Sequence, residues 1–222
     1  MEDVRIIEVK RSVYADNDLV AAQVREKMKE ENTFLLNMMS SPGSGKTSTL
    51  LALAKELEGK LRWGVMEADI DSAVDAEALV NAGIHAIQIH TGGACHLDAD
   101  MTRQGLAEIG SADLDMVILE NVGNLVCTAG FDTGSVKNMT ILSVPEGDDK
   151  PLKYPRMYEI CDLLVVNKTD VLEYFDFDCE RLEANAKLRN PKIEILYVSA
   201  RTGEGMEALA QWILREANGW NR

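Results

Sequence analysis

The sequence has little histidine, few aromatic residues and a shortage of basic side chains. Of its 222 residues, 3 are His and 5% are aromatic, and 37 Asp and Glu outnumber 23 Lys and Arg to give a formal net charge of −14. Proteins bind nucleic acids through basic surfaces that neutralise phosphates, so this balance predicts no nucleic-acid partner. A net negative charge is still compatible with a few basic residues around a small phosphate ligand.

Long hydrophobic runs are missing as well. No apolar stretch approaches the roughly 20 residues that cross a bilayer, and the N-terminal segment MEDVRIIEVKRS lacks the apolar core of a secretory signal. These absences predict a cytoplasmic protein with no membrane partner. In that compartment we expect cysteines to be free or metal-bound and not disulfide-bonded; the four are Cys95, Cys127, Cys161 and Cys179.

Apolar strands alternate with amphipathic helices along the chain. We predict strands at 34–39, 63–66, 86–89, 116–119, 139–144, 163–166 and 193–198, and helices at about 16–30, 46–57, 75–82, 97–109, 179–188 and 206–216. The alternation indicates an α/β fold of three layers with a mostly parallel sheet, in which ligands bind at the carboxyl ends of strands. We expect a single domain over 1–222, with 1–31 as an N-terminal helical extension and 132–155 as a loop-containing excursion.

A phosphate-binding loop is predicted at Ser40–Thr47 (SSPGSGKT), because this segment follows a strand and opens a helix. Glycines let backbone N–H groups cradle phosphate oxygens, while Lys46 is expected to act in catalysis on the β- and γ-phosphates and Thr47 to bind Mg²⁺. Ser40 stands where the GxxxxGK[ST] pattern has its first glycine. The predicted phosphate-binding residues are Gly43, Ser44, Gly45, Lys46, Thr47 and Ser48.

A guanine site is predicted from Asn167-Lys168-Thr169-Asp170, which follows an apolar strand. The Asp170 carboxylate can accept hydrogen bonds from N1–H and the N2 amine of guanine, a donor pair that adenine lacks. Asn167 is expected to brace the loop and the Lys168 stem to cover the base. In Ser199-Ala200-Arg201, after the last predicted strand, the N–H of Ala200 is expected to reach guanine O6. The nucleotide is therefore predicted to be GTP.

A third motif, Glu120-Asn121-Val122-Gly123, ends the fourth predicted strand. Glu120 is expected to bind Mg²⁺ directly or through water, and the N–H of Gly123 to meet the γ-phosphate. Asp69 and Asp75 are candidates to complete the Mg²⁺ shell or to orient the attacking water, and the alternative is that they cap a helix. Because the sequence shows no clear glutamine or arginine finger, we expect slow hydrolysis.

Cys95, His96 and Cys127 lie on segments that leave the carboxyl ends of strands. Cys and His are donors that select Zn²⁺ or Ni²⁺ over Mg²⁺. Three donors are few for a closed site, and two adjacent residues do not easily point at one ion. A site shared across the two-fold axis of a homodimer solves both problems. The alternative is a buried cysteine and a helix-capping histidine with no role in metal binding.

Seven strings together resemble the HypB family, GTPases that assist nickel insertion into [NiFe] hydrogenases: SSPGSGKT, ADIDSAVDAEAL, TGGACHLDADM, ILENVGNLVC, DKPLKYP, VVNKTD and VSARTGEGM. The resemblance implies a P-loop G domain related to signal-recognition and nitrogenase-iron-protein NTPases. It also implies a nucleotide-dependent homodimer, and Cys95, His96 and Cys127 as ligands of Ni²⁺ or Zn²⁺. The implied partners are a HypA-like nickel chaperone and a hydrogenase large-subunit precursor, and the helix near 16–31 is implied to serve in partner binding or packing.

The chain departs from this family in two places. No cysteine precedes Cys95 and only three histidines exist, which argues against nickel storage, and Thr128 stands where members often have proline. Two alternatives stay open. One is a UreG-like urease nickel GTPase, although that family's Cys-Pro-His string is absent. The other is a dimerisation module gated by zinc, in which hydrolysis merely resets assembly.

Overall fold

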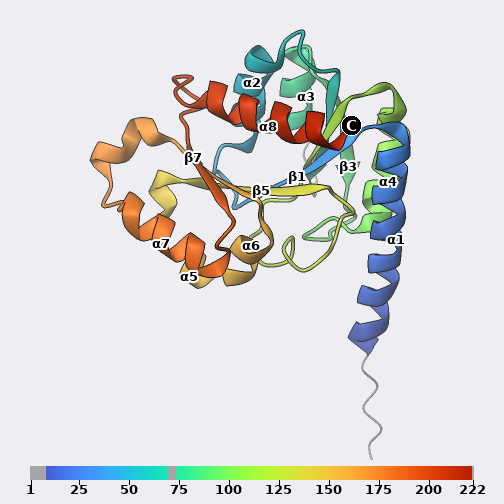
Figure 1. Ribbon diagram of the computed structural model, residues 1–222, viewed down its shortest axis with the longest axis horizontal. Coiled ribbons are helices and arrows are strands. Elements are labelled where there is room, and N and C mark those ends of the chain that lie inside the picture. The colour runs from blue at the N-terminus through green and yellow to red at the C-terminus, as the bar shows by residue number, and fades with distance from the viewer. Residues whose placement is uncertain (1–8, 70–73, 222) are drawn as a thin grey trace, which may run out of the picture.

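A single parallel sheet of seven strands forms the middle of the molecule in the computed structural model, which describes residues 9–69 and 74–221 (Figure 1). The strand order is β3-β2-β4-β1-β5-β6-β7. The bounds are β1 Phe34–Ser40, β2 Trp63–Asp69, β3 His85–His90, β4 Met116–Glu120, β5 Lys137–Ser143, β6 Leu163–Asn167 and β7 Glu194–Tyr197. Because every pairing is parallel, the carboxyl ends of all these strands lie along one edge.

Helices cover both faces of the sheet and complete the predicted three layers (Figure 1). One face packs against α2, α3 and α8, and the other against α1 and α4 at one end and α6 and α7 at the other. The bounds are α1 Val9–Glu31, α2 Lys46–Leu57, α3 Val74–Asn81, α4 Ala99–Ile109, α5 Lys150–Lys153, α6 Pro155–Ile160, α7 Cys179–Arg189 and α8 Met206–Trp220, with 3₁₀ turns at Ser111–Asp113, Val144–Glu146 and Thr169–Tyr174.

The central strand β1 is buried at all seven positions, as its nearly continuous apolar run predicts. Leu36 and Met38 pack with the α2 and α8 side chains. Leu35 faces the opposite layer, among residues of α1 and α4. This double covering fixes β1 in the middle of the sheet, between β4 and β5, so that the loop after it emerges at the centre of the carboxyl edge.

Two predicted elements differ from the structure. Helix α1 begins at Val9, before the predicted start at 16, where Asp16 or Asp18 was expected to cap it; both lie exposed within the helix. An exposed Asp is hydrated by solvent at any position on the outer face of a helix, so its presence alone does not mark the first turn. The excursion at 132–155 contains β5 and the short helix α5, and α6 starts at its end with Pro155 in the first turn. Residues 1–8 of the predicted extension lie outside the described residues.

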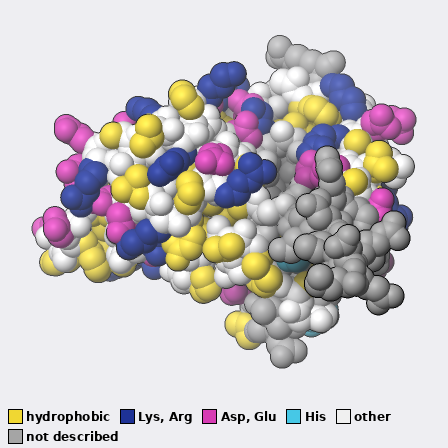
Figure 2. All heavy atoms as spheres, turned by 90° about the horizontal axis from the view of Figure 1, so that it is seen from below, with side chains coloured by type: hydrophobic (Ala, Val, Ile, Leu, Met, Phe, Trp, Pro, Cys, Tyr) yellow, Lys and Arg dark blue, Asp and Glu magenta, His cyan; other side chains and the backbone are white. Residues whose placement is uncertain are grey.

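The molecular surface mixes charges of both signs. Figure 2 shows Lys and Arg side chains interspersed with Asp and Glu on one face, together with small hydrophobic patches. Among the described residues, no helix has the length and apolar character needed to cross a membrane.

Asp148 ties the segment after β5 to the start of α7. Its carboxylate accepts from Arg181 Nε at 2.9 Å, Arg181 Nη2 at 2.6 Å and the Asp178 N–H at 2.7 Å. The guanidinium of Arg181 holds the pKa of Asp148 below its usual range. The stability that this bond contributes is therefore present above the ordinary aspartate range and is lost as the pH falls through the lowered pKa.

Replacing Asp148 with alanine is expected to lower the free energy of unfolding by about 2 kcal/mol, because three charge-assisted or backbone bonds to a buried carboxylate are lost. The matched control is Asp149→Ala, which removes an ion pair to Lys153 from a carboxylate that is 46% exposed, against 4% for Asp148. The control should lose about 0.5 kcal/mol or less. Urea unfolding at neutral pH measures both, and equal losses would contradict the assignment.

Candidate functional site

The predicted phosphate-binding loop joins β1 to α2 at the centre of the carboxyl edge. Gly45 precedes the helix with φ +98°, a left-handed conformation that glycine adopts without strain. Lys46 begins α2 and donates from Nζ to the buried Ser40 hydroxyl at 3.2 Å. Ser40, which replaces the first glycine of the GxxxxGK[ST] pattern, therefore accepts a hydrogen bond from the lysine of the loop. The Ser44 hydroxyl is buried and makes no hydrogen bond within the described part of the chain.

A cavity of about 240 Å³ lies beside this loop, where the predicted guanine-binding residues converge. Its lining comes from three separate segments of the sequence: the start of α2, the loop after β6 and the loop after β7. The residues are Gly45, Ser48, Asn167, Lys168, Asp170, Val171, Ala200 and Arg201. Residues separated by more than a hundred positions are therefore neighbours here, as their places at the ends of parallel strands predict.

Asn167 and Lys168 fasten the loop after β6 to the phosphate-binding loop. Asn167 Nδ2 donates to the Ser44 carbonyl at 3.0 Å, and Lys168 Nζ donates to the Gly43 carbonyl at 2.7 Å. These bonds point the carbonyls of Gly43 and Ser44 toward the loop after β6. Because the C=O and N–H of a trans peptide point in opposite directions, the N–H groups of the next residues point away from that loop. Asn167 braces the loop as predicted, since its Oδ1 also accepts from the N–H groups of Lys168 and Ala200 at 2.8 and 3.1 Å.

Asp170 is held as a carboxylate. The Ser199 hydroxyl donates to Oδ1 at 2.7 Å, and the exposed Arg201 guanidinium lies 3.4 Å from Oδ2. The hydrogen bond from Ser199 is the main cause that lowers the pKa of Asp170. The predicted base-reading oxygens are therefore negatively charged at neutral pH, as the acceptors of two guanine N–H groups should be.

The four predicted magnesium residues lie in different surroundings. Thr47 is half-buried in the first turn of α2. Glu120 is buried at the end of β4, beside the phosphate-binding strand. Asp75 is exposed in the first turn of α3. Asp69 ends β2, and its side chain lies outside the described residues. The sequence motifs missed Glu67, which is also buried and is paired with Glu120 in the β2–β4 register. An acidic residue inside an apolar strand is unusual, and that feature of the sequence could have identified it.

Gly123 brings the segment after β4 against the phosphate-binding loop. A Cβ at this position would lie 3.1 Å from both the backbone nitrogen and Cγ of Pro42. Only glycine fits that approach without displacing the loop. The backbone of the Glu120–Gly123 motif therefore lies directly against the phosphate-binding loop.

The predicted cysteine and histidine donors gather on one side of this edge. Cys95 Sγ lies 3.9 Å from His96 Nδ1, and the neighbouring Cys95 thiol, together with burial, raises the pKa of Cys127. Burial also lowers the pKa of His96, which favours the neutral imidazole that binds metals. Among the described residues of one chain, no three His, Cys, Asp or Glu side chains are arranged to hold a metal ion. The donors suit a soft or borderline cation, but one copy does not form a complete site.

Asn124 and Thr128 shape the turn that presents Cys127. Asn124 Oδ1 accepts from the N–H groups of Val126 and Cys127 at 2.7 and 2.9 Å. The Thr128 hydroxyl donates to the Asn124 carbonyl. A proline at this position would have a fixed φ but no hydroxyl, so here a hydrogen bond restrains the turn.

The other cysteines and His85 have structural surroundings. Cys161 is buried in the core, and Cys179 is the first residue of α7. His85 Nε2 donates to the Ile109 carbonyl at 3.0 Å.

Residues 34–197 match the family model described as "CobW/HypB/UreG, nucleotide-binding domain". The hydrogenase maturation factor HypB of Rhizobium leguminosarum bv. viciae is 45% identical over 213 residues, which cover 96% of this chain and 71% of that protein. This chain belongs to the HypB family. The same factor from Escherichia coli (strain K12) is 40% identical over 96% of this chain and 73% of its own length.

Solved structures agree with the family assignment. The crystal structure of HypB from Helicobacter pylori in complex with nickel has a TM-score of 0.87 at 37% identity, over 92% of this chain and 96% of that one. HypB from Archaeoglobus fulgidus gives 0.85 at 36% identity, over 92% of this chain and 100% of that one. The signal recognition particle receptor FtsY from Elizabethkingia anophelis shares the fold, with a TM-score of 0.54 at 16% identity, over 86% of this chain and 67% of that one.

Gly45→Ala is expected to weaken GTP binding at least about tenfold more than Gly43→Ala. Both glycines have positive φ, so both substitutions strain the backbone, but only the Cβ at Gly45 meets another residue, at 2.5 Å from Asn167 Nδ2. At Gly43 nothing lies within 4 Å. Titration with a fluorescent GTP analogue compares the variants. Equal losses would show that the packing of Asn167 on the loop does not matter for binding.

Proposed function

We propose that this protein is a slow GTPase that assists nickel insertion into a [NiFe] hydrogenase precursor in the cytoplasm, acting as a nucleotide-dependent homodimer. The observation that supports this most directly is the position of Asn121. It follows Glu120 in the nucleotide motif, and its side chain bonds to Leu97, the residue after the Cys95-His96 pair. Nickel is the cargo of this reaction and not a resident cofactor.

Each residue at the phosphate end of the site has a separate proposed role. Lys46 and the N–H groups from Gly43 to Ser48 bind the β- and γ-phosphates, and the buried Ser44 hydroxyl adds a donor. Thr47 and Glu120 would hold Mg²⁺, with Asp69 or Asp75 completing its shell, and the ion would neutralise charge at the phosphates. The same two aspartates are the candidates to orient the attacking water. The N–H of Gly123, a residue that lies against Pro42 of the phosphate-binding loop, would meet the γ-phosphate.

The base end selects guanine through Asp170 and the loop after β7. Both carboxylate oxygens keep lone pairs for the base beyond their bonds to Ser199 and Arg201. The Ala200 N–H, which is expected to reach guanine O6, donates to Asn167 Oδ1 in this structure. Guanine binding therefore requires Ala200 to share or exchange that bond.

Coupling between the nucleotide and the metal runs through Asn121. This buried side chain accepts from the Leu97 N–H at 3.2 Å and donates to Asn37 Oδ1 of β1 at 3.2 Å. Its own N–H donates to the Met38 carbonyl at 2.9 Å. When the γ-phosphate leaves, movement of the Glu120–Gly123 segment shifts Leu97 and with it the Cys95-His96 pair. Two copies of Cys95, His96 and Cys127 together supply six donors, whereas one copy supplies only three.

A second candidate is a urease maturation factor. Two relatives from Helicobacter, each 37% identical, are named hydrogenase/urease maturation factors. Binding of purified protein to hydrogenase and urease precursors separates the two functions. A zinc-gated dimerisation module is the remaining alternative, and in that case Cys95→Ala would abolish dimers and leave nickel delivery intact.

The proposed function is tested by nickel transfer from the purified protein to a metal-free hydrogenase large-subunit precursor, in the presence of a HypA-like chaperone. Transfer should require GTP, and a non-hydrolysable analogue should not support it. Cys95→Ala should abolish transfer without changing GTP affinity. Transfer that is equal with GTP, GDP and no nucleotide would contradict the proposed coupling.

Asp170→Asn is expected to weaken GTP binding by at least about a hundredfold, because an amide donor then faces the N2 amine of guanine. The variant should prefer xanthosine triphosphate, whose C2 carbonyl accepts from that amide. Glu173→Gln is the matched control, since it removes a charge from an exposed residue of the same 3₁₀ turn. Competition binding with the two nucleotides gives the result, and an unchanged base preference would exclude Asp170 as the base-reading residue.

Asn121→Ala is expected to reduce the effect of a GTP analogue on nickel affinity by about tenfold, within the usual range of coupling between two sites. Asn138→Ala is the control, because it removes the neighbouring hydrogen bond to Asn37 and leaves the bond between Asn121 and the Leu97 N–H in place. Nickel affinity is measured with and without the analogue by competition with a chromophoric chelator. If the alanine variant retains the wild-type response, coupling takes another route.

A further inference from the structure

Helix α1 reaches both loops that carry the candidate metal ligands. Asn17 Nδ2 donates to the Asp132 carbonyl at 2.9 Å, on the loop that follows Cys127. Its Oδ1 accepts from the Ala99 N–H at 2.9 Å, where α4 begins just after the Cys95-His96 pair. A single side chain therefore sets the separation between the two loops.

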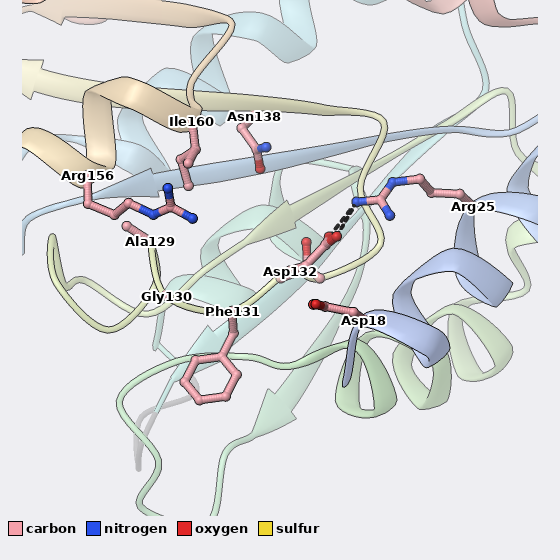
Figure 3. Close-up of a pocket in the computed structure, with 10 residues that line it drawn as sticks. Asp18, Arg25, Ala129, Gly130, Phe131, Asp132, Asn138, Arg156 and Ile160 are labelled. Carbon is pink, nitrogen blue, oxygen red and sulfur yellow. Dashed lines mark hydrogen bonds and ion pairs between the residues drawn. The ribbon is translucent and has the colours of Figure 1, made fainter. Parts of the chain in front are cut away.

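Arg25, about two turns further along α1, binds the same loop. Its Nη2 lies 2.5 and 2.6 Å from the two Asp132 oxygens, and its Nε donates to the Ser135 carbonyl at 3.1 Å. Figure 3 shows this ion pair, with Asp18 of the same helix nearby. Asp132 Oδ1 also accepts from the Gly134 N–H at 2.9 Å, so the carboxylate organises its own loop as well.

The loop after Cys127 lies directly on the backbone of α1. Gly134 has φ +80°, and a Cβ there would lie 2.6 Å from Val24 Cβ and 3.0 Å from the Ala21 carbonyl. Glycine is needed both for the backbone conformation and for the close approach. The loop is thus packed against the helix in addition to being hydrogen-bonded to it.

Phe131 carries this attachment to the histidine. It precedes Asp132, and its ring stacks on His96 with centroids 3.9 Å apart and an interplanar angle of 13°. It also lines a cavity of about 420 Å³ between α1, the 129–133 loop and α6 (Figure 3). A loop fixed at Asp132 holds the Phe131 ring in place, and that ring limits the orientations open to the imidazole.

We propose that α1 is the positioning element of the Cys95, His96 and Cys127 site, and that Asn17 sets the spacing between its two ligand loops. This inference rests on the proposed metal-binding function. Residues that orient metal ligands without touching the metal typically contribute ten- to a hundredfold in affinity. We expect loss of Asn17 to weaken nickel binding by about that factor while the distant guanine pocket is unaffected.

Three variants test the proposal with Ni²⁺ as the probe, in the presence of a saturating GTP analogue so that the proposed homodimer forms. Asn17→Ala removes both bridging bonds, Asn17→Asp keeps only the acceptor for Ala99, and Arg25→Met removes the ion pair but keeps most of the aliphatic stem. The matched control is Arg62→Met, which breaks an equivalent pair with Asp115 at the opposite edge of the sheet. Nickel affinity, the thiolate-to-nickel charge-transfer absorption, GTP affinity and the thermal midpoint are measured for each.

The expected result is a ten- to a hundredfold loss of nickel affinity and an altered charge-transfer spectrum in Asn17→Ala. Arg25→Met should show smaller changes and Asn17→Asp intermediate ones. Arg62→Met should bind nickel like wild type even if its thermal midpoint falls by a similar amount, which separates positioning from general stability.

Cys95→Ser distinguishes failure of this inference from failure of the proposed function. If Cys95→Ser weakens nickel binding while Asn17→Ala and Arg25→Met bind like wild type with the same spectrum, the role of α1 is wrong and the metal site stands. If Cys95→Ser also binds nickel like wild type, both are overturned.

Discussion

A row of three amides crosses the middle of the sheet, and the two halves of the site depend on it; Asn37 and Asn121 are buried and Asn138 is half-buried. Asn37 in β1 donates to Asn138 of β5 at 3.0 Å and accepts from Asn121 at 3.2 Å, and Asn121 in turn accepts from Leu97. A buried amide without partners costs about 1–3 kcal/mol, so each member is tolerated only because the next one satisfies it. The strand that leads into the phosphate-binding loop is thereby hydrogen-bonded to the segment that carries Cys95 and His96.

The sequence was sufficient to predict the order of the larger elements, because buried parallel strands are apolar runs and helices show a different period. The bounds of α2 agree with its predicted range of 46–57, since the glycine-rich loop marks its start. Local patterns did not reveal α5 and α6, which are each under two turns long and begin among prolines. They also misplaced the start of α1, where no capping residue marks Val9.

The candidate site was predictable only where its chemistry is local. The SSPGSGKT and NKTD strings each contain several contacts within a few residues, so their convergence followed from the rule that ligands bind at strand ends. The supports around them come from distant residues: Asn17 bonds to Asp132 over 115 positions, and Phe131 stacks on His96. A polar residue on a helix gives no sign of which loop it will meet, because that depends on tertiary packing.

Two hydrogen bonds hold the segment that follows Cys95 and His96, one from the nucleotide motif and one from α1. Their free energies are similar, so neither one dominates. The Leu97 N–H is bound by Asn121 from the nucleotide side, and the Ala99 N–H by Asn17 from α1. Each bond contributes about 1 kcal/mol net, whereas coupling between ligand sites is typically about 1–3 kcal/mol. Neither bond is strong enough to lock the segment against nucleotide binding, yet either is strong enough to bias it. In the proposed coupling, α1 on one side is the reference against which the nucleotide motif moves the candidate metal donors.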